Sequence, residues 1–397
     1  MRADRPRVYV VLALALACAW YAPDANALTV RDQAAGAGLA QTTSSYGAYF
    51  GDVNGDGRID ILLNRHWQRT SQIFTDRGGG VFGVAATLPL ADRHGCAMAD
   101  VNHDGLMDIY CAQGASDVSG SVVKSNELWM QGPLGQFTNR AAAWGVADPY
   151  GRGREVAFFD ANNDGWPDLF VGNVGGRTDG IPSPDRLFIN VAGQRFVDSK
   201  DPAITRELGG SCVTHRDING DGWRDLLVCG AGHWGGPIHL FVNQAGKGFA
   251  DRASQLGISG TAHDARLVDL NGDKRLDLVT INQTGVRVQM RSATGGWRPP
   301  VLVRALVAGY SVAVRDVNGD GAPDIYALQR CANGRNQPDI MLVNSGNGTS
   351  YTRVAIPEAA SGCGDDVESM SYRSAPAFLV LNGFSQSTGP VQLITFG

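Results

Sequence analysis

The sequence predicts an all-β fold, a seven-bladed β-propeller with calcium-binding loops in six of its blades. Three observations point to it. A nine-residue segment of the form D-x-N-x-D-G-x-x-D occurs six times, with one copy lacking the Gly, the copies begin about fifty residues apart, and short apolar runs flank each copy. A repeat of this length matches one four-stranded blade, and stacked blades bury a core that no blade buries alone.

The nine-residue segments begin at residues 52, 100, 160, 217, 269 and 316, and each has Asp at positions 1, 5 and 9 and Asn at position 3. Side-chain oxygens at alternate positions of a tight loop suit Ca²⁺, which takes six to eight oxygen ligands, better than Mg²⁺, which keeps its waters. We therefore expect up to six Ca²⁺ ions. The predicted ligands are Asp52, Asn54, Asp56, Asp60, Asp100, Asn102, Asp104, Asp108, Asp160, Asn162, Asp164, Asp168, Asp217, Asn219, Asp221, Asp225, Asp269, Asn271, Asp273, Asp277, Asp316, Asn318, Asp320 and Asp324.

Two other interpretations of the segment are weaker. A single copy would be read as a polar surface turn, but six copies in phase argue against that. An EF-hand needs Glu at position 12 and flanking helices, whereas short apolar strand formers follow each loop here. Position 6 is Gly in five loops and Lys274 in the fifth, so we expect the fifth site to be the weakest. Against the EF-hand, position 12 carries no Glu in any copy: it is Leu63, Cys111, Val171, Val228, Thr280 or Ala327.

Each repeat follows the same order of predicted strands. One strand leads into the Asp loop and a second leaves it. A third follows a loop of variable length and ends near Phe74, Met130, Ile189, Val242, Gln289 or Val343. After a Gly-rich turn, a fourth is expected around Phe82, Phe137, Phe196, Phe249, Trp297 or Tyr351.

The last blade needs strands from both ends of the chain. Beyond Tyr351 only three strand-like runs follow, at 367–372, 377–381 and 391–395. The segment 28–33 reads like a fourth strand, so we expect it to complete the seventh blade and protect the sheet edges of an open array.

The first 27 residues read as a secretory signal peptide. Arginines precede an apolar run at 8–22, and Ala25-Asn26-Ala27 has the pattern of a cleavage site. The domains expected are thus a signal peptide at 1–27 and a single propeller at 28–397. We expect a monomer that is secreted, periplasmic or at the cell surface, with no further transmembrane segment. Lipidation at Cys18 is a weaker alternative.

Six cysteines remain outside the signal peptide, and an even number in an exported protein indicates disulfides. Cys96 and Cys111 flank the second Asp loop, and Cys212 and Cys229 flank the fourth. In both pairs the midpoint between the two cysteines falls at the same position of the loop, which is the centre of the hairpin. Both pairs should therefore face each other across antiparallel strands. Cys331 and Cys363 would pair by exclusion.

The ligand face is expected on the side opposite the Asp loops, where the second-to-third-strand loops and the interblade connections lie. A His-Trp pair occurs at the same place in blades one and four, and exposed Trp with His and Arg donors suits sugars or acidic side chains. The alternative is that both Trp side chains fill gaps between blades. The candidate residues are His66, Trp67, Arg69, His94, Arg152, His233, Trp234 and His263.

Beyond these patterns, the chain resembles a known family. Its Asp loops, with L-F-x-N-x-x-G-x-F segments at 187–196 and 240–249, are similar to FG-GAP/VCBS repeats. Such repeats build the calcium-loop propellers of integrin α-chain N-termini and of secreted proteins of the cartilage acidic protein type. The latter resemblance is clearest at 246–257. It implies a seven-bladed calcium propeller and says little about activity.

The function indicated is a binding or adhesion module for a carbohydrate or an extracellular protein. No metalloprotease, P-loop or dinucleotide motif occurs, and Gly309-Tyr-Ser-Val-Ala313 lacks the last Gly of a nucleophile elbow. No basic stripe with interleaved aromatics indicates nucleic acid. We therefore expect no enzyme. The alternatives are a polysaccharide-active lyase or hydrolase on a propeller scaffold and a purely structural extracellular scaffold.

Overall fold

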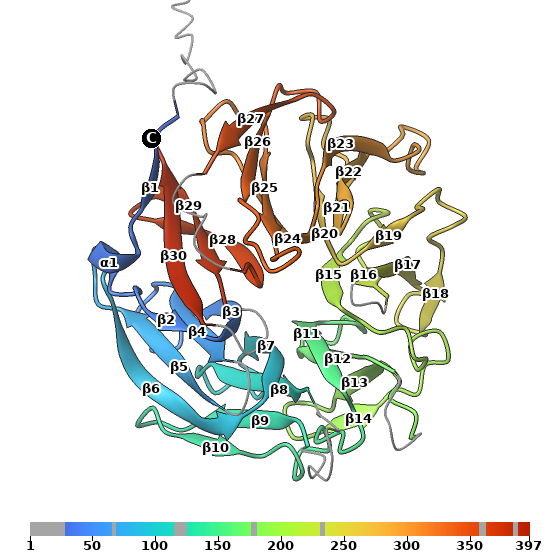
Figure 1. Cartoon of the computed structure of the whole chain (residues 1–397). Coiled ribbons are helices and arrows are strands. Elements are labelled where there is room, and N and C mark those ends of the chain that lie inside the picture. Colours follow the sequence, from blue (N-terminus) through green and yellow to red (C-terminus); the bar gives the residue numbers. More distant parts are fainter. Residues whose placement is uncertain are drawn as a thin grey trace, which may run out of the picture.

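The computed structural model describes residues 28–65, 69–114, 125–175, 181–230, 235–356, 363–383 and 388–397. The strands in these segments form seven antiparallel sheets arranged around a central axis (Figure 1). The predicted all-β, seven-bladed propeller is confirmed. The proposed signal peptide lies outside the described residues.

The first four blades each contain four strands that follow one another from the axis to the rim: β3 (Ser45–Gly51), β4 (Asp60–Arg65), β5 (Arg69–Asp76) and β6 (Phe82–Ala91); β7 (Arg93–Ala99), β8 (Asp108–Gln113), β9 (Glu127–Gln131) and β10 (Phe137–Asn139); β11 (Gly153–Phe159), β12 (Asp168–Asn173), β13 (Arg186–Asn190) and β14 (Phe196–Asp198); β15 (Cys212–Arg216), β16 (Asp225–Cys229), β17 (Gly236–Asn243) and β18 (Phe249–Asp251).

Blades five to seven follow in the same way: β20 (Asp264–Val268), β21 (Asp277–Asn282), β22 (Gly285–Gln289) and β23 (Val301–Ala305); β24 (Gly309–Arg315), β25 (Asp324–Gln329), β26 (Ile340–Asn344) and β27 (Tyr351–Ala355); β28 (Asp366–Tyr372), β29 (Ala375–Leu381), β30 (Gly389–Phe396) and β1 (Val30–Asp32). Two short strands, β2 (Thr42–Thr43) and β19 (Thr261–Ala262), pair with β30 and β17. The helix α1 (Ala34–Ala37) has four residues, and no helix in the described segments is long and apolar enough to cross a membrane.

The second strand of each blade is buried on both faces, which explains its continuous apolar sequence. In β25, Ile325 packs toward blade five and Tyr326 toward blade seven, and both side chains are fully buried. The alternation follows from the two-residue period of a strand. In the described residues the apolar core accordingly divides into seven clusters, one between each pair of neighbouring blades.

The two ends of the described chain meet in the seventh blade. Residues Val30 to Asp32 of β1 pair antiparallel with Phe396 to Ile394 of β30, and Figure 1 shows the two strands side by side. The backbone N–H of Thr29 also donates to the carbonyl of Gly397 at 2.7 Å. The seventh sheet is therefore built from both ends of the chain.

The Asp at position 9 of every loop is fully buried and joins two strands of its blade. In blade three, Oδ2 of Asp168 accepts the N–H of Ala161 at 2.9 Å, and Oδ1 accepts the N–H of Asn190, the last residue of β13, at 2.7 Å. Because buried N–H groups need acceptors, this carboxylate fixes the loop to the third strand. The same two bonds recur at Asp60, Asp108, Asp225, Asp277 and Asp324.

The last residue of the third strand also reaches the preceding blade. The amide Nδ2 of Asn190 donates to the carbonyl of Val101 in the loop of blade two at 2.9 Å and to the carbonyl of Pro167 in its own loop at 3.2 Å. The third strand of blade three is thus tied to the loop of blade two. Four further pairs make the link to the preceding loop: Gln131 to Val53, Asn243 to Ala161, Arg291 to Ile218 and Asn344 to Leu270.

All three predicted disulfides are confirmed: Cys96–Cys111, Cys212–Cys229 and Cys331–Cys363. The first two join directly opposed residues of antiparallel strands. The Cys96 pair packs toward blade one and the Cys212 pair toward blade five. A one-residue difference in offset therefore places the two bridges on opposite faces of their blades.

One predicted strand is wrong in position. The fourth strand of blade five was expected around Trp297, but β23 begins at Val301. Trp297 instead forms an isolated bridge with Arg291, whose guanidinium carbon lies 3.8 Å from the centroid of the indole. The buried indole fills the space between blades four and five, so its aromatic signal came from packing and not from a strand.

The interblade amide link yields a stability prediction. Asn243→Ala removes the donor to the carbonyl of Ala161, which lies in the preceding blade at 2.7 Å. Leaving this buried acceptor unpaired should cost about 1–3 kcal/mol. The neighbouring Gln244 is exposed, so Gln244→Ala is a matched control that should change little. Urea unfolding midpoints measure both, and equal shifts in the two variants would refute the link.

Candidate functional site

The first strands of the seven blades enclose an axial channel with a cavity of about 1030 Å³, lined by residues of β3, β7, β11, β15, β20, β24 and β28. In blades one to six, each of these strands ends at an Asp loop. Residues at the start of the strands therefore lie at the opposite mouth of the channel. This is the face on which the sequence predicts the ligand.

Three of the eight predicted ligand residues line the channel: His94, Arg152 and His263. Arg69 starts the third strand of blade one, is exposed and does not line the channel. The other four, His66, Trp67, His233 and Trp234, lie outside the described residues, so their role stays a prediction.

Four β-bulges shape the channel mouth. The pairing register shifts between Ser45 and Gly47, Arg93 and Cys96, Gly153 and Glu155, and Gly309 and Ser311. Bulges redirect side chains and are frequent beside functional sites. The side chains at these bulges that line the channel are Tyr46, His94, Arg154 and Tyr310.

The bulged residues share one position in the sequence, because each stands six residues before the first Asp of its loop. His263 and Ser211 occupy the same position in blades five and four and also line the channel. The six residues therefore form one ring of polar and aromatic groups, which we call the mouth ring. Its members are Tyr46, His94, Arg154, Ser211, His263 and Tyr310.

Neighbouring members of the mouth ring contact each other. The ring centroids of Tyr46 and His94 are 4.3 Å apart, and those of His263 and Tyr310 are 3.5 Å apart. The guanidinium of Arg330, whose Nη2 lies 3.0 Å from Oδ1 of Asp365, covers the Tyr310 ring at 3.1 Å. Burial raises the pKa of Tyr46 to about 12 and that of Tyr310 well above its usual value. Both hydroxyls therefore stay protonated and can donate hydrogen bonds at neutral pH.

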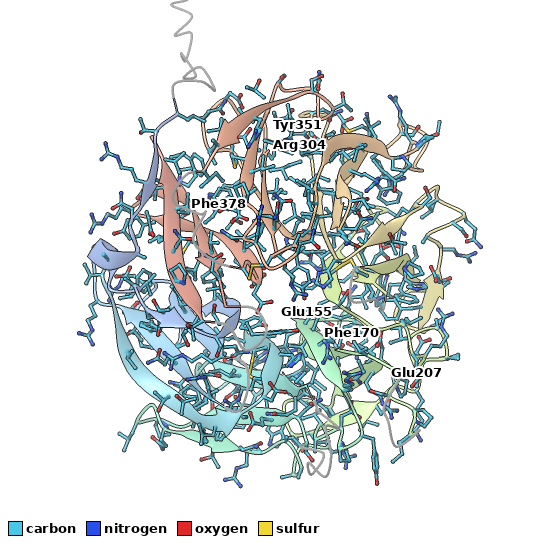
Figure 2. The ribbon with its side chains drawn as sticks, in the orientation of Figure 1. Glu155, Phe170, Glu207, Arg304, Tyr351 and Phe378 are labelled. Atoms are coloured by element: carbon cyan, nitrogen blue, oxygen red, sulfur yellow. A yellow bond between two sulfur atoms is a disulfide. The ribbon has the colours of Figure 1, made fainter. Side chains whose placement is uncertain are left out.

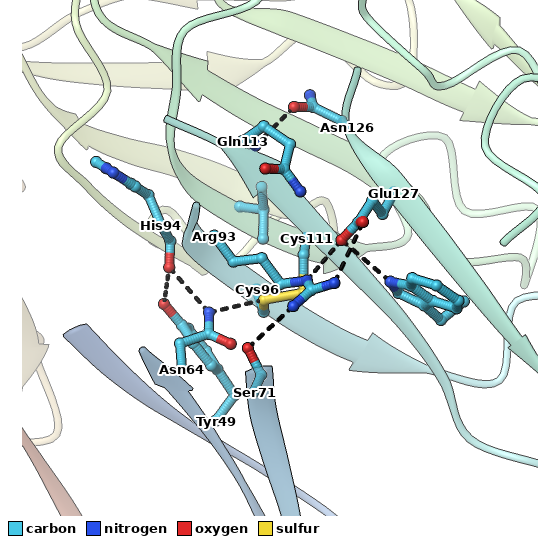
Figure 3. The surroundings of a disulfide bond; sticks show 12 residues. Tyr49, Asn64, Ser71, Arg93, His94, Cys96, Cys111, Gln113, Asn126 and Glu127 are labelled. Carbon is cyan, nitrogen blue, oxygen red and sulfur yellow. Dashed lines mark hydrogen bonds and ion pairs between the residues drawn. A yellow bond between two sulfur atoms is a disulfide. The ribbon is translucent and has the colours of Figure 1, made fainter. Parts of the chain in front are cut away.

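His94 is held in place by the interface between blades one and two. Its backbone carbonyl accepts hydrogen bonds from the hydroxyl of Tyr49 at 2.8 Å and from Nδ2 of Asn64 at 3.1 Å, beside the Cys96–Cys111 disulfide (Figure 3). The preceding residue, Arg93, is fully buried and pairs with Oε2 of Glu127 at 2.5 Å. This segment is therefore anchored to its neighbours on both sides of the imidazole.

Below the mouth ring, two carboxylates and a hydroxyl join the inner strands of four blades. Oδ2 of Asp264 in blade five accepts the N–H of Val312 in blade six at 2.9 Å. Oδ2 of Asp366 in blade seven accepts the N–H of Ala48 in blade one at 3.4 Å. Oγ of Ser311 lies between them, 3.0 Å from Asp264 and 3.2 Å from Asp366. These groups pair N–H groups at inner-strand edges, so their role is structural.

Arg266 is the cation nearest to this group. Its guanidinium pairs with Asp264 and, at 2.9 Å, with Oε1 of Glu368. Burial works to lower the pKa of Arg266, but these two carboxylates outweigh burial and raise it above its usual value. The guanidinium therefore stays charged. Burial raises the pKa of Glu368, and Arg266 opposes this. The net effect raises the pKa of Glu368 to about 8.

Glu155 also lines the channel, but in the described residues it has no ion pair like those of Asp264 and Glu368 with Arg266. Figure 2 shows it beside the centre of the ring, and its one hydrogen bond in the described part of the chain comes from the N–H of Val156 at 3.2 Å. Burial raises its pKa well above the usual value, and repulsion from Asp366, Glu368 and Asp264 raises it further. These effects favour the protonated form of Glu155, which can act as a hydrogen-bond donor or acid.

The Asp loops at the other end of the channel have the chemistry of a hard-cation site. In blade three, Oδ1 of Asp160 accepts the N–H of Asp164 at 3.1 Å and Oδ2 accepts that of Gly165 at 2.8 Å. The N–H of Trp166 donates to Oδ1 of Asp164 at 2.9 Å. Each of these exposed oxygens keeps a second lone pair for a cation. Positive φ at position 6 occurs in all six loops, including 65° at Lys274.

Carboxylates alone do not complete such a site. In the described residues, no group of three or more His, Cys, Asp and Glu side chains is placed to hold a metal ion. Calcium would need the Asn oxygen at position 3 and backbone carbonyls as further ligands. Among the residues present, Asp at positions 1 and 5 and Asn at position 3 fit that requirement best, because the Asp at position 9 is buried beneath them.

Replacing Glu155 by Gln should stabilise the protein more at pH 8 than at pH 5. The pKa of Glu155 is higher in the folded chain than its unfolded value of about 4.3. The wild-type folded state therefore loses stability as the pH rises above that value. Gln has a similar shape and no proton to lose. Calorimetric melting temperatures at both pH values test this, and an advantage that is constant or shrinks toward pH 8 would contradict it.

Comparisons with known proteins agree with the fold. Four segments, 52–111, 100–171, 217–280 and 269–327, match a family model described as FG-GAP-like repeat, and together they cover more than half of the chain. Cartilage acidic protein 1 of Homo sapiens is 26% identical over 230 residues, which are 55% of this chain and 33% of that protein. Integrin alpha-3 of Cricetulus griseus is 40% identical over 81 residues, which are 17% of this chain and 8% of that protein.

A solved structure extends the comparison of folds. An Agrocybe aegerita lectin, described as recognising non-reducing terminal N-acetylglucosamine, aligns with a TM-score of 0.51 and 17% identity, covering 79% of this chain and 81% of its own. The match to human cartilage acidic protein 1 spans only about a third of that protein, at 33%. From the repeats and the seven-bladed architecture, the chain belongs to the FG-GAP-like repeat family.

Proposed function

We propose that the protein is an exported, calcium-stabilised binding module that holds a carbohydrate or protein ligand at the mouth of its axial channel. The observation that carries this proposal is the mouth ring, where bulges in the inner strands of blades one, two, three and six turn side chains toward one opening. Bulges interrupt strand pairing, so a fold that needed only packing would gain nothing from four of them at one level.

The chemistry of the mouth favours a carbohydrate over a strongly charged ligand. The channel wall mixes cationic, anionic and neutral groups, and two of its guanidiniums, those of Arg266 and Arg330, are already paired with carboxylates. Hydroxyls, imidazoles and guanidiniums around an aromatic rim offer directional hydrogen bonds to an uncharged polyol. The lectin with the similar fold and the integrin relative agree with a binding role.

Export and calcium binding complete the proposal. Three disulfides are typical of proteins that fold in an oxidising compartment. The Asp loops bring exposed carboxylates together, and a cation would relieve their repulsion and bind only the folded chain. When bound, Ca²⁺ would supply positive charge at the ends of the inner strands, opposite the ligand.

A polysaccharide-active enzyme is the second candidate, and one observation favours it. Burial favours the protonated form of Glu155, Glu368 is ion-paired with Arg266, and both carboxyls line the same channel. An acid and a carboxylate that flank a bound sugar are the groups that glycoside hydrolases use. The binding experiment below therefore includes a product assay.

Calcium removal should lower the melting temperature markedly, because binding to the folded state adds stability by mass action. Asp164→Ala should destabilise the calcium-loaded protein more than Asp273→Ala, since Lys274 already weakens the fifth loop. Differential scanning fluorimetry with and without chelator measures both effects. An unchanged melting temperature, once metal analysis confirms removal, would refute the stabilising role.

Arg154→Ala should weaken binding of a glycan selected from an array by at least about tenfold, because charged hydrogen bonds contribute roughly 1.5–3 kcal/mol each. Tyr46→Phe removes one donor and should weaken it less. Arg298 is exposed on blade five and does not line the channel, so Arg298→Ala should bind normally. Calorimetric titration gives the dissociation constants.

Three outcomes would change the assignment. Equal binding by the Arg154→Ala and Arg298→Ala variants would place the ligand elsewhere. An array without any bound glycan would favour a protein ligand. Release of reducing or unsaturated ends from a polysaccharide, lost in Glu155→Gln, would show that the protein is an enzyme.

A further inference from the structure

The six Asp loops differ at position 7 in a way that bears on cation binding. The first and fifth loops have arginine there, Arg58 and Arg275. The side chains at this position in the other four loops carry no charge: Leu106, Trp166, Trp223 and Ala322.

Both arginines pair with a predicted calcium ligand of their own loop. Nη2 of Arg58 lies 2.5 Å from Oδ2 of Asp56, and Nη2 of Arg275 lies 2.5 Å from Oδ2 of Asp273. Nε of Arg58 also donates to the carbonyl of Asp76 at 3.0 Å, so this guanidinium links the loop to the end of the third strand. Within the described segments, Nε of Arg275 makes no such bond, so what the two loops share is the ion pair with position 5.

These contacts engage the position-5 carboxylate more fully than in the other loops. In the first loop, Oδ2 of Asp56 accepts Nδ2 of Asn54 at 2.8 Å as well as the guanidinium, and Oδ1 accepts the N–H of Arg58 at 2.9 Å. In the third loop, Asp164 accepts the corresponding amide and N–H groups and, among the described residues, no cationic side chain. A cation in the first or fifth loop must displace a guanidinium and then bind close to its charge.

The position of the arginine matters as much as its charge. The fourth loop has Arg224 at position 8, and that side chain makes no ion pair with a loop carboxylate in the described part of the chain. The fourth loop therefore contains an arginine, as the first and fifth do, but its Asp221 keeps the same bonds as Asp164. The ion pair therefore arises from position 7, whose side chain can turn back toward position 5.

We propose that Arg58 and Arg275 are built-in counter-ions that take the place of calcium in the first and fifth loops, so that only four of the six loops bind the ion tightly. The proposal rests on the calcium role proposed above for the other loops. A single positive charge about 5 Å from a divalent ion in a water-like medium weakens binding roughly tenfold. In the fifth loop, Lys274 adds a second positive charge.

Counting bound ions tests the proposal. The full-length mature protein is stripped with chelator, titrated with Ca²⁺ alone, and examined by native mass spectrometry and calorimetry. We expect four tight sites in the wild type and six in the Arg58→Ala/Arg275→Ala double variant. Arg224→Ala is the matched control, because it removes an arginine from a loop without an ion pair, and it should keep four.

The reverse substitution makes the test independent of the double variant. Leu106→Arg places arginine at position 7 of the second loop and should reduce the count from four to three, with circular dichroism checking that the fold is kept. Six sites of similar affinity in the wild type, or a double variant that stays at four, would overturn the proposal. A wild type that binds no calcium would instead overturn the calcium role itself.

Discussion

The buried aspartate at the end of each loop is the interaction on which the ring depends. Its two oxygens accept one N–H from the loop and one from the third strand, so a single side chain fixes the turn and the strand together. The residue at that strand end, Asn190 in blade three, then reaches the carbonyl of the preceding loop. Each loop is thus positioned by its own aspartate, and the first five loops are also held by the next blade. Blade seven, which has no such loop, is held by Asp366 and by strand pairing with β1.

The sequence was sufficient for most of the architecture because its signals were local and repeated. The loop spacing predicted the blades, and the cysteine offsets predicted which residues face each other across β7 and β8. The fourth strand of blade five was misplaced because an aromatic residue can mark a strand or fill a gap. Trp297 fills a gap, where Arg291 covers its indole. Composition does not distinguish these two uses.

The candidate site was only partly predictable. His94, Arg152 and His263 follow from the choice of face, but Tyr46, Arg154 and Tyr310 were missed because their orientation depends on bulges, which have no fixed sequence signature. The common position six residues before each loop was a signal that could have found them. Glu155 is a different case. Its raised pKa comes first from burial and then from carboxylates in blades five and seven, and both arise only when the ring closes.

The way the ring closes also has a mechanical consequence. Thr29 and Gly397 exchange backbone hydrogen bonds at one end of the β1–β30 pair. A force that pulls these two ends apart loads the pair like a zipper, one bond at a time, and not in shear along its whole length. The three-residue strand β1 would separate first and release α1, while the blade contacts held by the buried aspartates stay intact. Tension between Thr29 and Gly397 would therefore detach the outer strand of blade seven at one defined seam, while the inner strands that line the channel stay in contact.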